Sequence, residues 1–207
     1  MPPKCKYTKD EILQAALTLT RKEGSHALTA RELAKRLKIS VKPIFTAFTD
    51  MDELRASVRT AAFEVYADYQ RDFADYTPAP KRYGMQLIFF AYKEPRLFSL
   101  LFVEKEPTAP DSAAQGLIGH TDGVASVLQR NYALSKEDAL RLLSLIYAVT
   151  FGLAVSVAEG RTPYDEEEIA RLLSTAFYGS LTALREKDLD KYLATAAVRK
   201  ASKEETI

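Results

Sequence analysis

The chain has 207 residues, 47% of them hydrophobic, so it is long and apolar enough to bury a core, and wholesale disorder is excluded. It has no tryptophan and is rich in residues of high helix propensity. Residues 1–48 hold ten Lys and Arg against four Asp and Glu, a formal charge of +6; because the total is +1, the other 159 residues carry −5. This division suits a protein whose basic end meets a polyanion, although a solvated lysine face is the alternative.

The cysteine count and the apolar runs bear on where the protein works. Cys5 is the single cysteine and cannot close an intrachain disulfide, which favours a reducing, cytoplasmic setting. Met1–Lys9 is polar, and we expect no secretory signal there. Residues 142–158 lack charges, but the run is shorter than the ~20 residues of a membrane span, and hydroxyl side chains interrupt it. We therefore expect a helix buried in a core or a subunit interface, and no membrane partner.

Capping residues and apolar side chains at helical spacing predict helices along most of the chain. Hydroxyl-x-x-carboxylate boxes begin at Thr8, Thr29 and Ser135, a similar start occurs at Asp50, and Gly24 is a natural stop. The expected helical segments are 8–24, 29–37, 40–48, 50–76, 81–94, 96–102, 113–132, 135–159 and 165–186, with loops at 77–80 and 104–112 and one more short helix within 187–207. No alternating strand and no internal repeat appear in the sequence, so the fold class is all-α.

Two short helices joined by a turn of about three residues lie within residues 29–49. In the first helix and the turn, Leu33, Ala34, Leu37 and Ile39 are expected to face inward, as are Ile44 and Phe48 in the second helix. Ser40 is suited to cap the second helix, and Pro43 is tolerated in that helix's first turn, where no N–H is needed.

The remaining residues of the second helix are expected to point outward; they are Val41, Lys42, Pro43, Phe45 and Thr46. A short exposed helix held by a partner helix suits insertion into the major groove of DNA, which predicts a helix-turn-helix. The alternative is a plain helical hairpin inside a bundle.

The order of residues around this hairpin resembles the DNA-binding domain of the tetracycline-repressor (TetR) family of bacterial regulators. The resemblance covers residues 8–66 and is carried by Ile12-Leu13-x-Ala15-Ala16, Gly24, Thr29-Ala30-x-x-Leu33-Ala34, Ile39-Ser40, Ile44-Phe45-x-x-Phe48 and Glu53-Leu54. It implies an N-terminal three-helix helix-turn-helix domain at 1–50, joined by a long helix to a helical effector-binding and dimerisation domain at 51–207. It also implies transcriptional regulation by a homodimer on a near-palindromic double-stranded DNA operator, from which a small-molecule effector releases it.

Residue by residue, the resemblance implies a set of DNA contacts. Thr29 would bind phosphate through its hydroxyl and its helix N-terminus, and Lys42 and Thr46 would reach base edges or phosphates. Val41, Pro43 and Phe45 would make apolar contacts, for example to thymine methyl groups. The full predicted DNA-binding set is Thr29, Arg31, Lys38, Ser40, Val41, Lys42, Pro43, Phe45 and Thr46.

Three positions depart from the family pattern. Phe45 stands where family members usually have Tyr, so one hydroxyl-to-phosphate bond is absent. Met51 stands where Lys is frequent, which removes another phosphate contact. Lys38 occupies a turn position that is often Gly. Lys42, Lys38 and Arg31 are candidates to replace the lost contacts.

The body of the chain offers less specific signals. If the resemblance holds, the helices within 136–159 and 165–186 supply the dimer interface, with Ala154, Ala158, Ala176, Phe177 and Ser180 as candidate members; the alternative is that both helices simply fill the core. Residues 83–103 contain six aromatic residues, which favours a pocket for a hydrophobic or aromatic effector, although ordinary core packing is the alternative. The candidate lining residues are Phe89, Phe102, Tyr147 and Phe151.

The search for catalytic and metal-binding patterns yields little. His26 and His120 lie far apart and have no Cys or carboxylate at metal-ligand spacing, and Glu166-Glu167-Glu168 stands at a helix start, where carboxylates stabilise the helix dipole. Phosphate-binding loops and nucleophile elbows are missing from the sequence. We expect no metal, no cofactor and no enzyme activity. The competing hypothesis is a helical ligand-binding or interaction protein that has lost specific DNA binding.

Overall fold

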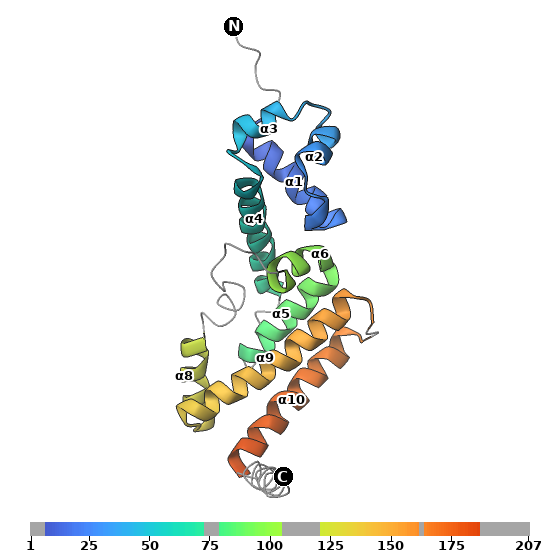
Figure 1. Ribbon diagram of the computed structural model, residues 1–207. Helices are drawn as coiled ribbons and strands as arrows, with labels where there is room; N and C mark the ends of the chain where they lie inside the picture. Colours follow the sequence, from blue (N-terminus) through green and yellow to red (C-terminus); the bar gives the residue numbers. More distant parts are fainter. Residues whose placement is uncertain (1–6, 73–78, 105–120, 162–163, 187–207) are drawn as a thin grey trace, which may run out of the picture.

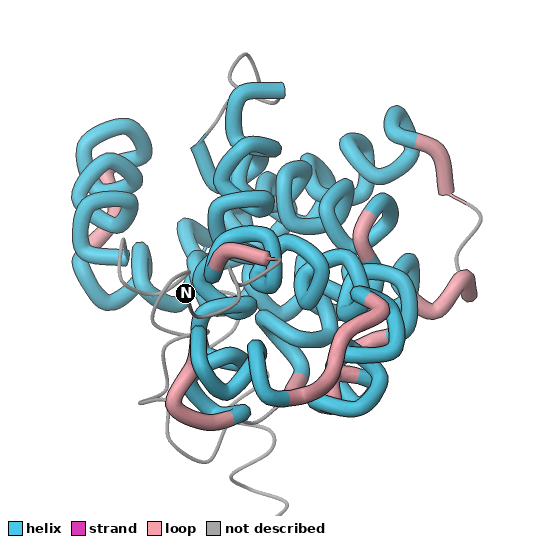
Figure 2. Tube along the Cα trace, turned by 90° about the horizontal axis from the view of Figure 1, so that it is seen from above, coloured by secondary structure: helices cyan, strands magenta, loops and turns pink. Residues whose placement is uncertain are grey.

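The computed structural model describes residues 7–72, 79–104, 121–161 and 164–186, and all regular structure in these ranges is helical (Figure 2). Figure 1 shows a small group of helices at the N-terminal end, from which one long helix runs into a larger group. We call α1–α3 the head and α5–α10 the body. The predicted all-α class is confirmed.

The head consists of α1 (Lys9–Glu23), the 3₁₀ turn η1 (Ser25–Ala27), α2 (Ala30–Leu37) and α3 (Lys42–Ala47). Thr8 and Glu11 form the complete capping box predicted for α1. At Thr29 the hydroxyl accepts the Glu32 N–H at 3.2 Å, as predicted for the N-cap of α2. Gly24 ends α1 at φ 92°, a backbone conformation that an L side chain rarely adopts.

The long helix α4 (Met51–Asp72) connects the head to the body (Figure 1). The body contains α5 (Ala79–Lys93), α6 (Pro95–Phe98), the π-helical turn η2 (Ser99–Val103), α8 (Thr121–Tyr132), α9 (Lys136–Ala158) and α10 (Glu166–Glu186). α5 packs mainly against α9 and α4, with α10 also against α5. A Cβ at Gly84 of α5 would lie 2.9 Å from Leu173 Cδ1 and 3.2 Å from Thr150 Oγ1, so glycine permits the close approach of these three helices.

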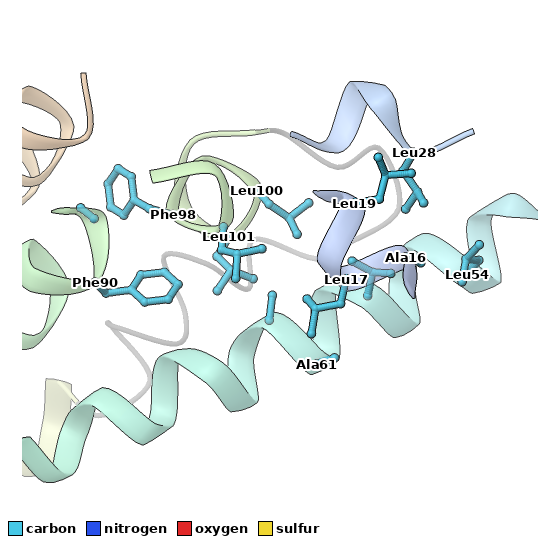
Figure 3. Packing of buried hydrophobic residues seen from close by; sticks show 14 of the residues in the cluster. Ala16, Leu17, Leu19, Leu28, Leu54, Ala61, Phe90, Phe98, Leu100 and Leu101 are labelled. Carbon is cyan, nitrogen blue, oxygen red and sulfur yellow. The ribbon is translucent and has the colours of Figure 1, made fainter. Parts of the chain in front are cut away.

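One buried cluster extends without a break from the head into the body. It includes Ile12 and Leu33 from the head, Leu54 and Val58 from α4, and Leu101 from η2, each at most 1% exposed. Figure 3 shows the side chains of α1, α4 and the 98–101 segment meeting in this cluster. Since α4 contributes to both ends, the domain boundary after residue 50 stays a prediction.

A second, smaller cluster joins α8 to α9 and α10. Its core consists of Ala125, Leu128, Ala139, Leu142, Ile146, Phe177 and Leu181. It holds α8 at the far end of α9 from the head (Figure 1).

Helix bounds agree with the sequence expectations over most of the described ranges. The main difference is after Pro95, where the expected helix 96–102 continues from α6 as a π-helical turn closed by the Glu104 N–H bonded to Ser99 O at 2.9 Å. The expected ends at 73–76, the helical start at 113–120, nearly all of the loop 104–112 and the tail 187–207 lie outside the described residues.

Candidate DNA-binding interface

The turn between α2 and α3 is set by a lysine in the left-handed region. Lys38 has φ 56° and ψ 45°, and the next residue, Ile39, donates its N–H to Ala34 O at 3.0 Å. This 6→1 hydrogen bond ends α2 as a glycine cap would. The departure from glycine at this position therefore leaves the helix-turn-helix turn intact.

The inward faces of the hairpin are those predicted from the sequence. Leu33, Ala34 and Leu37 of α2 are at most 9% exposed, and Ile44 and Phe48 are at most 1% exposed. Ile39, in the turn, is half-buried and packs against the same cluster. This packing places α3 against α1, and the other side of α3 is exposed.

The open side of α3 carries apolar, cationic and hydroxyl groups. Val41 is 39% exposed and Phe45 46% exposed, so two apolar side chains on this side of α3 face solvent. Lys42 and Thr46 are exposed as well, while Pro43 is half-buried. The Thr46 hydroxyl donates to Lys42 O at 3.0 Å and keeps lone pairs to accept a further hydrogen bond.

The start of α3 differs from the expectation in one respect. The N-cap is Val41, with φ −69° and ψ −21°, and no side chain caps this helix, so Ser40 does not have the predicted capping role. Pro43 lies in the first turn, as predicted. Ser40 itself is exposed beside the open face of α3.

The other predicted DNA contacts surround α3. Thr29, Arg31 and Lys38 are all exposed, at the start, first turn and C-cap of α2. Arg36 of the same helix forms ion pairs with Glu23 of α1 and Glu32 of α2, so its side chain is held within the head and is not directed outward with the others. The structure thus brings the predicted set to α2, the turn and α3, with three lysine or arginine side chains exposed among them.

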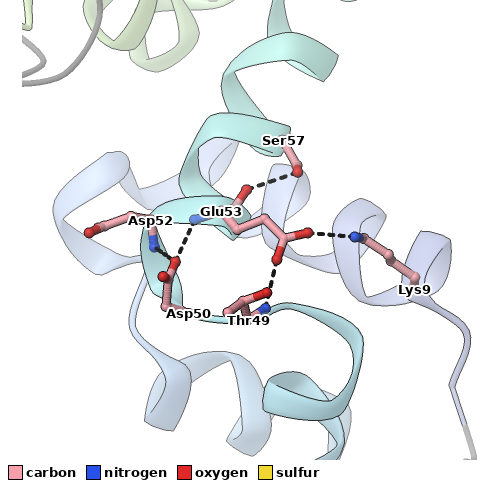
Figure 4. Close-up of polar contacts among 6 residues, drawn as sticks. All are labelled: Lys9, Thr49, Asp50, Asp52, Glu53 and Ser57. Atoms are coloured by element: carbon pink, nitrogen blue, oxygen red, sulfur yellow. Dashed lines mark hydrogen bonds and ion pairs between the residues drawn. The ribbon is translucent and has the colours of Figure 1, made fainter.

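An ion pair holds the start of α4 to the start of α1 (Figure 4). Lys9 Nζ lies 2.6 Å from Glu53 Oε1 and 4.6 Å from the centroid of the Phe48 ring. Glu53 also accepts the Thr49 N–H at 2.6 Å, and Asp50 accepts the Glu53 N–H at 2.8 Å. The Lys9 and Thr49 hydrogen bonds lower the pKa of Glu53 to about 2. This network fixes the start of α4 relative to α1, and Lys9 also contacts Phe48, the residue that ends α3.

Two buried polar contacts connect the head and α4 to the body, and sequence reasoning missed both. The Glu94 carboxylate, 7% exposed, accepts two hydrogen bonds from Arg21 of α1, one of them from Nε at 2.6 Å. The Glu94 hydrogen bond raises the pKa of Arg21. Arg59 of α4 donates from Nη2 to Leu101 O at 2.8 Å and from Nη1 to Leu100 O, the carbonyls of the π-helical turn. Arg21 and Glu94 are 73 residues apart in the sequence, and Arg59 is 41 and 42 residues from Leu100 and Leu101. Because of these separations, no local sequence pattern predicts either contact.

The aromatic residues predicted to line an effector pocket lie partly together. Phe98 links Phe102, at 5.6 Å between ring centroids, to Phe151 at 6.0 Å, and Tyr147 stacks on Phe151 at 5.7 Å. Phe89 faces Tyr92 instead, at 6.2 Å. All four predicted residues are half-buried. Three of the four are thus joined through one ring network, and the pocket stays a prediction.

Two predicted interface residues are in the chain's own core. Ala154 is fully buried and Phe177 is 2% exposed, which leaves no surface on them for a second copy. Ala158, Ala176 and Ser180 are half-buried. The large apolar side chains that are exposed on α9 and α10 are Leu145, Val149, Leu172 and Tyr178. The sequence does not distinguish the buried face of α9 from its exposed face, because this helix is apolar on nearly all sides.

α9 is also the one helix among the described residues that is long and apolar enough to cross a membrane. Its most apolar 18 residues have a mean hydropathy of 1.9, and 28% of them are buried inside the chain. Within the described ranges, no group of three or more His, Cys, Asp or Glu residues is placed to hold a metal ion.

Comparison with known proteins assigns the head. Residues 12–58 match the sequence model of "bacterial regulatory proteins, tetR family". The fold is similar to that of a TetR-like transcriptional regulator from Rhodococcus sp. RHA1, with a TM-score of 0.61, 16% identity and coverage of 84% of this chain and 95% of the other. It is also similar to a TetR family protein from Vibrio parahaemolyticus, with a TM-score of 0.56, 19% identity and coverage of 84% and 97%. The comparison with curated proteins finds no sequence match.

The match to residues 12–58 covers α1–α3 and the start of α4, which are the elements that build the exposed face of α3. The structural likeness extends the same fold through the body. Residues 12–58 thus form a helix-turn-helix domain that matches the tetR family of bacterial regulatory proteins, and the chain as a whole has the fold of two TetR-like regulators.

Proposed function

We propose that this protein is a TetR-family transcriptional regulator, a repressor that binds a near-palindromic operator as a homodimer and is released by a small hydrophobic or aromatic effector. The observation that carries the DNA-binding part is the open face of α3. There the cation of Lys42 stands beside the exposed apolar side chains of Val41 and Phe45, on a helix whose opposite side is buried.

These groups suit the major groove in two ways. Exposed Val41 and Phe45 offer apolar surface to thymine methyl groups, and Lys42 and Thr46 offer hydrogen bonds to base edges or phosphates. Thr29, Arg31 and Lys38 lie on the flanking helix and turn, where contacts to phosphate would fix the orientation of α3. In this arrangement Thr29, Arg31 and Lys38 bind phosphate, and the side chains of α3 read the base sequence.

The homodimer is proposed from the unpartnered apolar side of α9 and α10. Leu145, Val149, Leu172 and Tyr178 are 37–54% exposed, and most of the apolar stretch of α9 is not buried by its own chain. An isologous interface would cover this side with the same helices of a second copy. Two copies would also present two α3 helices to an operator with twofold symmetry.

The effector is proposed to bind near the ring network of Phe98, Phe102, Phe151 and Tyr147. These rings connect α6 and η2 to α9, and η2 in turn holds Arg59 of α4. A ligand that shifts this network would therefore act on the helix that carries the head. Effector control requires that the ligand bind the two arrangements of the head with different affinity.

The direct test is the salt dependence of binding to mixed-sequence duplex DNA. Each neutralised phosphate contributes a slope of about −0.9 to log K against log salt concentration. We expect Lys42→Gln to make the slope shallower by about 2 in a dimer, one unit for each copy. Lys136→Gln, an exposed lysine at the start of α9, is the matched control and leaves the slope unchanged.

Two results would count against the proposal. Equal effects of the two lysine variants would mean that α3 does not face the duplex. Absence of salt-dependent binding in the wild-type protein would favour the competing function, a helical ligand-binding protein without DNA affinity.

A further inference from the structure

The exposed side of α3 is divided along its length into an apolar row and a polar row. Val41 already has helical backbone angles, φ −69° and ψ −21°, so the helical spacing starts from it. Residues four positions apart lie on the same side of a helix, which places Val41 in line with Phe45 as the apolar row. Lys42 and Thr46 form the polar row in the same way. All four side chains are exposed, while Ile44 on the opposite side is fully buried.

The polar row offers one donor and one acceptor of hydrogen bonds. The Lys42 ammonium group is exposed and can only donate. The Thr46 hydroxyl donates to Lys42 O at 3.0 Å. Because a hydroxyl carries a single proton, Thr46 then acts toward other groups as an acceptor. The polar row therefore fits a base edge that presents an acceptor to Lys42 and an amino group to Thr46.

The apolar row fits methyl groups. Val41 is 39% exposed and Phe45 46% exposed, and neither side chain has a hydrogen-bonding group. Contact with a methyl group removes apolar surface of both partners from water, which stabilises a complex. Among the base edges that face the major groove, only that of thymine carries a methyl group. The apolar row therefore selects thymine.

An A·T base pair has the same division across the major groove. Its thymine side presents the methyl group, and its adenine side presents the N7 acceptor and the N6 amino donor. The two residues of each row are about 6 Å apart along the helix axis, which is close to two base-pair steps of about 3.4 Å. Two A·T pairs at this spacing meet both rows of α3 at once when their thymines are on the same strand.

We infer that each half-site of the operator contains two A·T pairs within three successive positions, with both thymines on one strand. The thymine methyl groups contact Val41 and Phe45. On the complementary strand, Lys42 donates to an adenine N7, and Thr46 accepts from an adenine N6 amino group. This inference rests on the proposed function and adds which base atoms α3 reads and on which strand they lie.

The test measures the affinity of the purified full chain for the duplex recovered from a random DNA pool, by fluorescence anisotropy at one salt concentration. Deoxyuridine replaces one thymine at a time, on either strand, and removes only the methyl group. We expect two thymines on one strand of each half-site to respond, with binding about fourfold weaker for each methyl group lost, as follows from ~0.8 kcal/mol for a buried carbon of this size.

Phe45→Ala assigns one of these methyl groups to its side chain. In this variant we expect deoxyuridine to have no effect at one of the two thymines and its full effect at the other. Tyr92→Ala is the matched control, because Tyr92 is an exposed aromatic residue of α5 in the body. It keeps the full effect at both thymines. Circular dichroism checks that both variants are folded.

Thr46→Val tests the acceptor in the polar row. The DNA change replaces a half-site adenine by the nebularine nucleotide, which lacks the N6 amino group. We expect the wild type to bind the changed duplex about threefold to tenfold more weakly at one adenine, and Thr46→Val to bind both duplexes equally. Thr175→Val is the matched control, because the Thr175 hydroxyl is exposed on α10 and donates to Arg171 O at 2.9 Å in the same way. It retains the wild-type response.

Three results would overturn the inference: no effect of deoxyuridine at any half-site thymine, equal effects on the two strands of a half-site, or the same response to nebularine in the wild-type and Thr46→Val proteins. A recovered inverted repeat without A·T pairs in its half-sites would overturn it as well and leave the proposed function intact. Recovery of no common motif would overturn both.

Discussion

Removing Arg21 and removing its buried ion-pair partner Glu94 are expected to cost very different amounts of stability. The Glu94 side chain is 7% exposed and the Arg21 side chain 49% exposed. Arg21→Met removes the cation and leaves a carboxylate that water hardly reaches, whereas Glu94→Gln leaves a guanidinium that is half in solvent. The two variants break the same contact and leave different groups behind.

The burial of each partner sets the expected magnitudes. Removing one partner of a fully buried pair costs about 3–5 kcal/mol. Since Arg21 is half exposed, we reduce this to about 2–4 kcal/mol for Arg21→Met, with methionine retaining the apolar stem of the side chain. Glu94→Gln keeps a hydrogen-bond acceptor beside a solvated cation, so we expect about 1 kcal/mol.

The assay is urea unfolding followed by circular dichroism at one fixed protein concentration, because a dimer's apparent stability depends on concentration. Arg171→Met breaks the exposed Arg171–Glu167 pair and serves as control, with an expected loss below about 0.5 kcal/mol. The reasoning is refuted if Glu94→Gln is as destabilising as Arg21→Met, or if Arg21→Met resembles the surface control.

Three further predictions concern the head, the body and the interface. The pKa of Glu53 is lowered to about 2, so its contribution to stability is complete above the ordinary pKa of 4.5 and is lost as the pH falls toward 2. In acid unfolding experiments the difference in free energy of unfolding between the wild type and Glu53→Gln should shrink across this range, and a constant difference would contradict the prediction. Gly84→Ala places a methyl group 2.9 Å from Leu173 Cδ1, so urea unfolding is expected to show a loss of stability of about 1–3 kcal/mol. An unchanged midpoint would show that α10 moves to make room for the methyl group at no cost. Leu145→Arg puts a charge on the exposed face of α9, and analytical ultracentrifugation is expected to show a dimer for the wild type and a monomer for the variant. An unchanged dimer would place the interface elsewhere, and a wild type that sediments only with detergent or lipid would favour a membrane site for α9.

The sequence was most informative where the determining residues are close together. The capping residues Thr8, Thr29 and Ser135 act within a single turn, and each accepts the backbone N–H three residues later, as predicted. The inward positions of α2 and α3 follow helical spacing and are buried. The main local error was the Ser40 cap, because α3 begins one residue later than expected, with Val41 as its N-cap.

The sequence was least informative about which face of an apolar helix meets which neighbour. Residues 142–158 are uncharged on all sides, so Ala154 was no better an interface candidate than Val149, and only packing shows that the first is buried and the second exposed. Arg21–Glu94 and the contacts of Arg59 join residues far apart in the chain. Their burial is a consequence of tertiary structure, and no local pattern encodes it.

The central claim, that α3 of two copies reads DNA sequence, is tested most directly by selecting duplexes from a random DNA pool with the purified wild-type protein. We predict recovery of an inverted repeat whose half-sites are separated by about one helical turn or a multiple of it, as a twofold dimer requires. Recovery of no common motif, with weak binding that disappears at moderate salt, would contradict the claim.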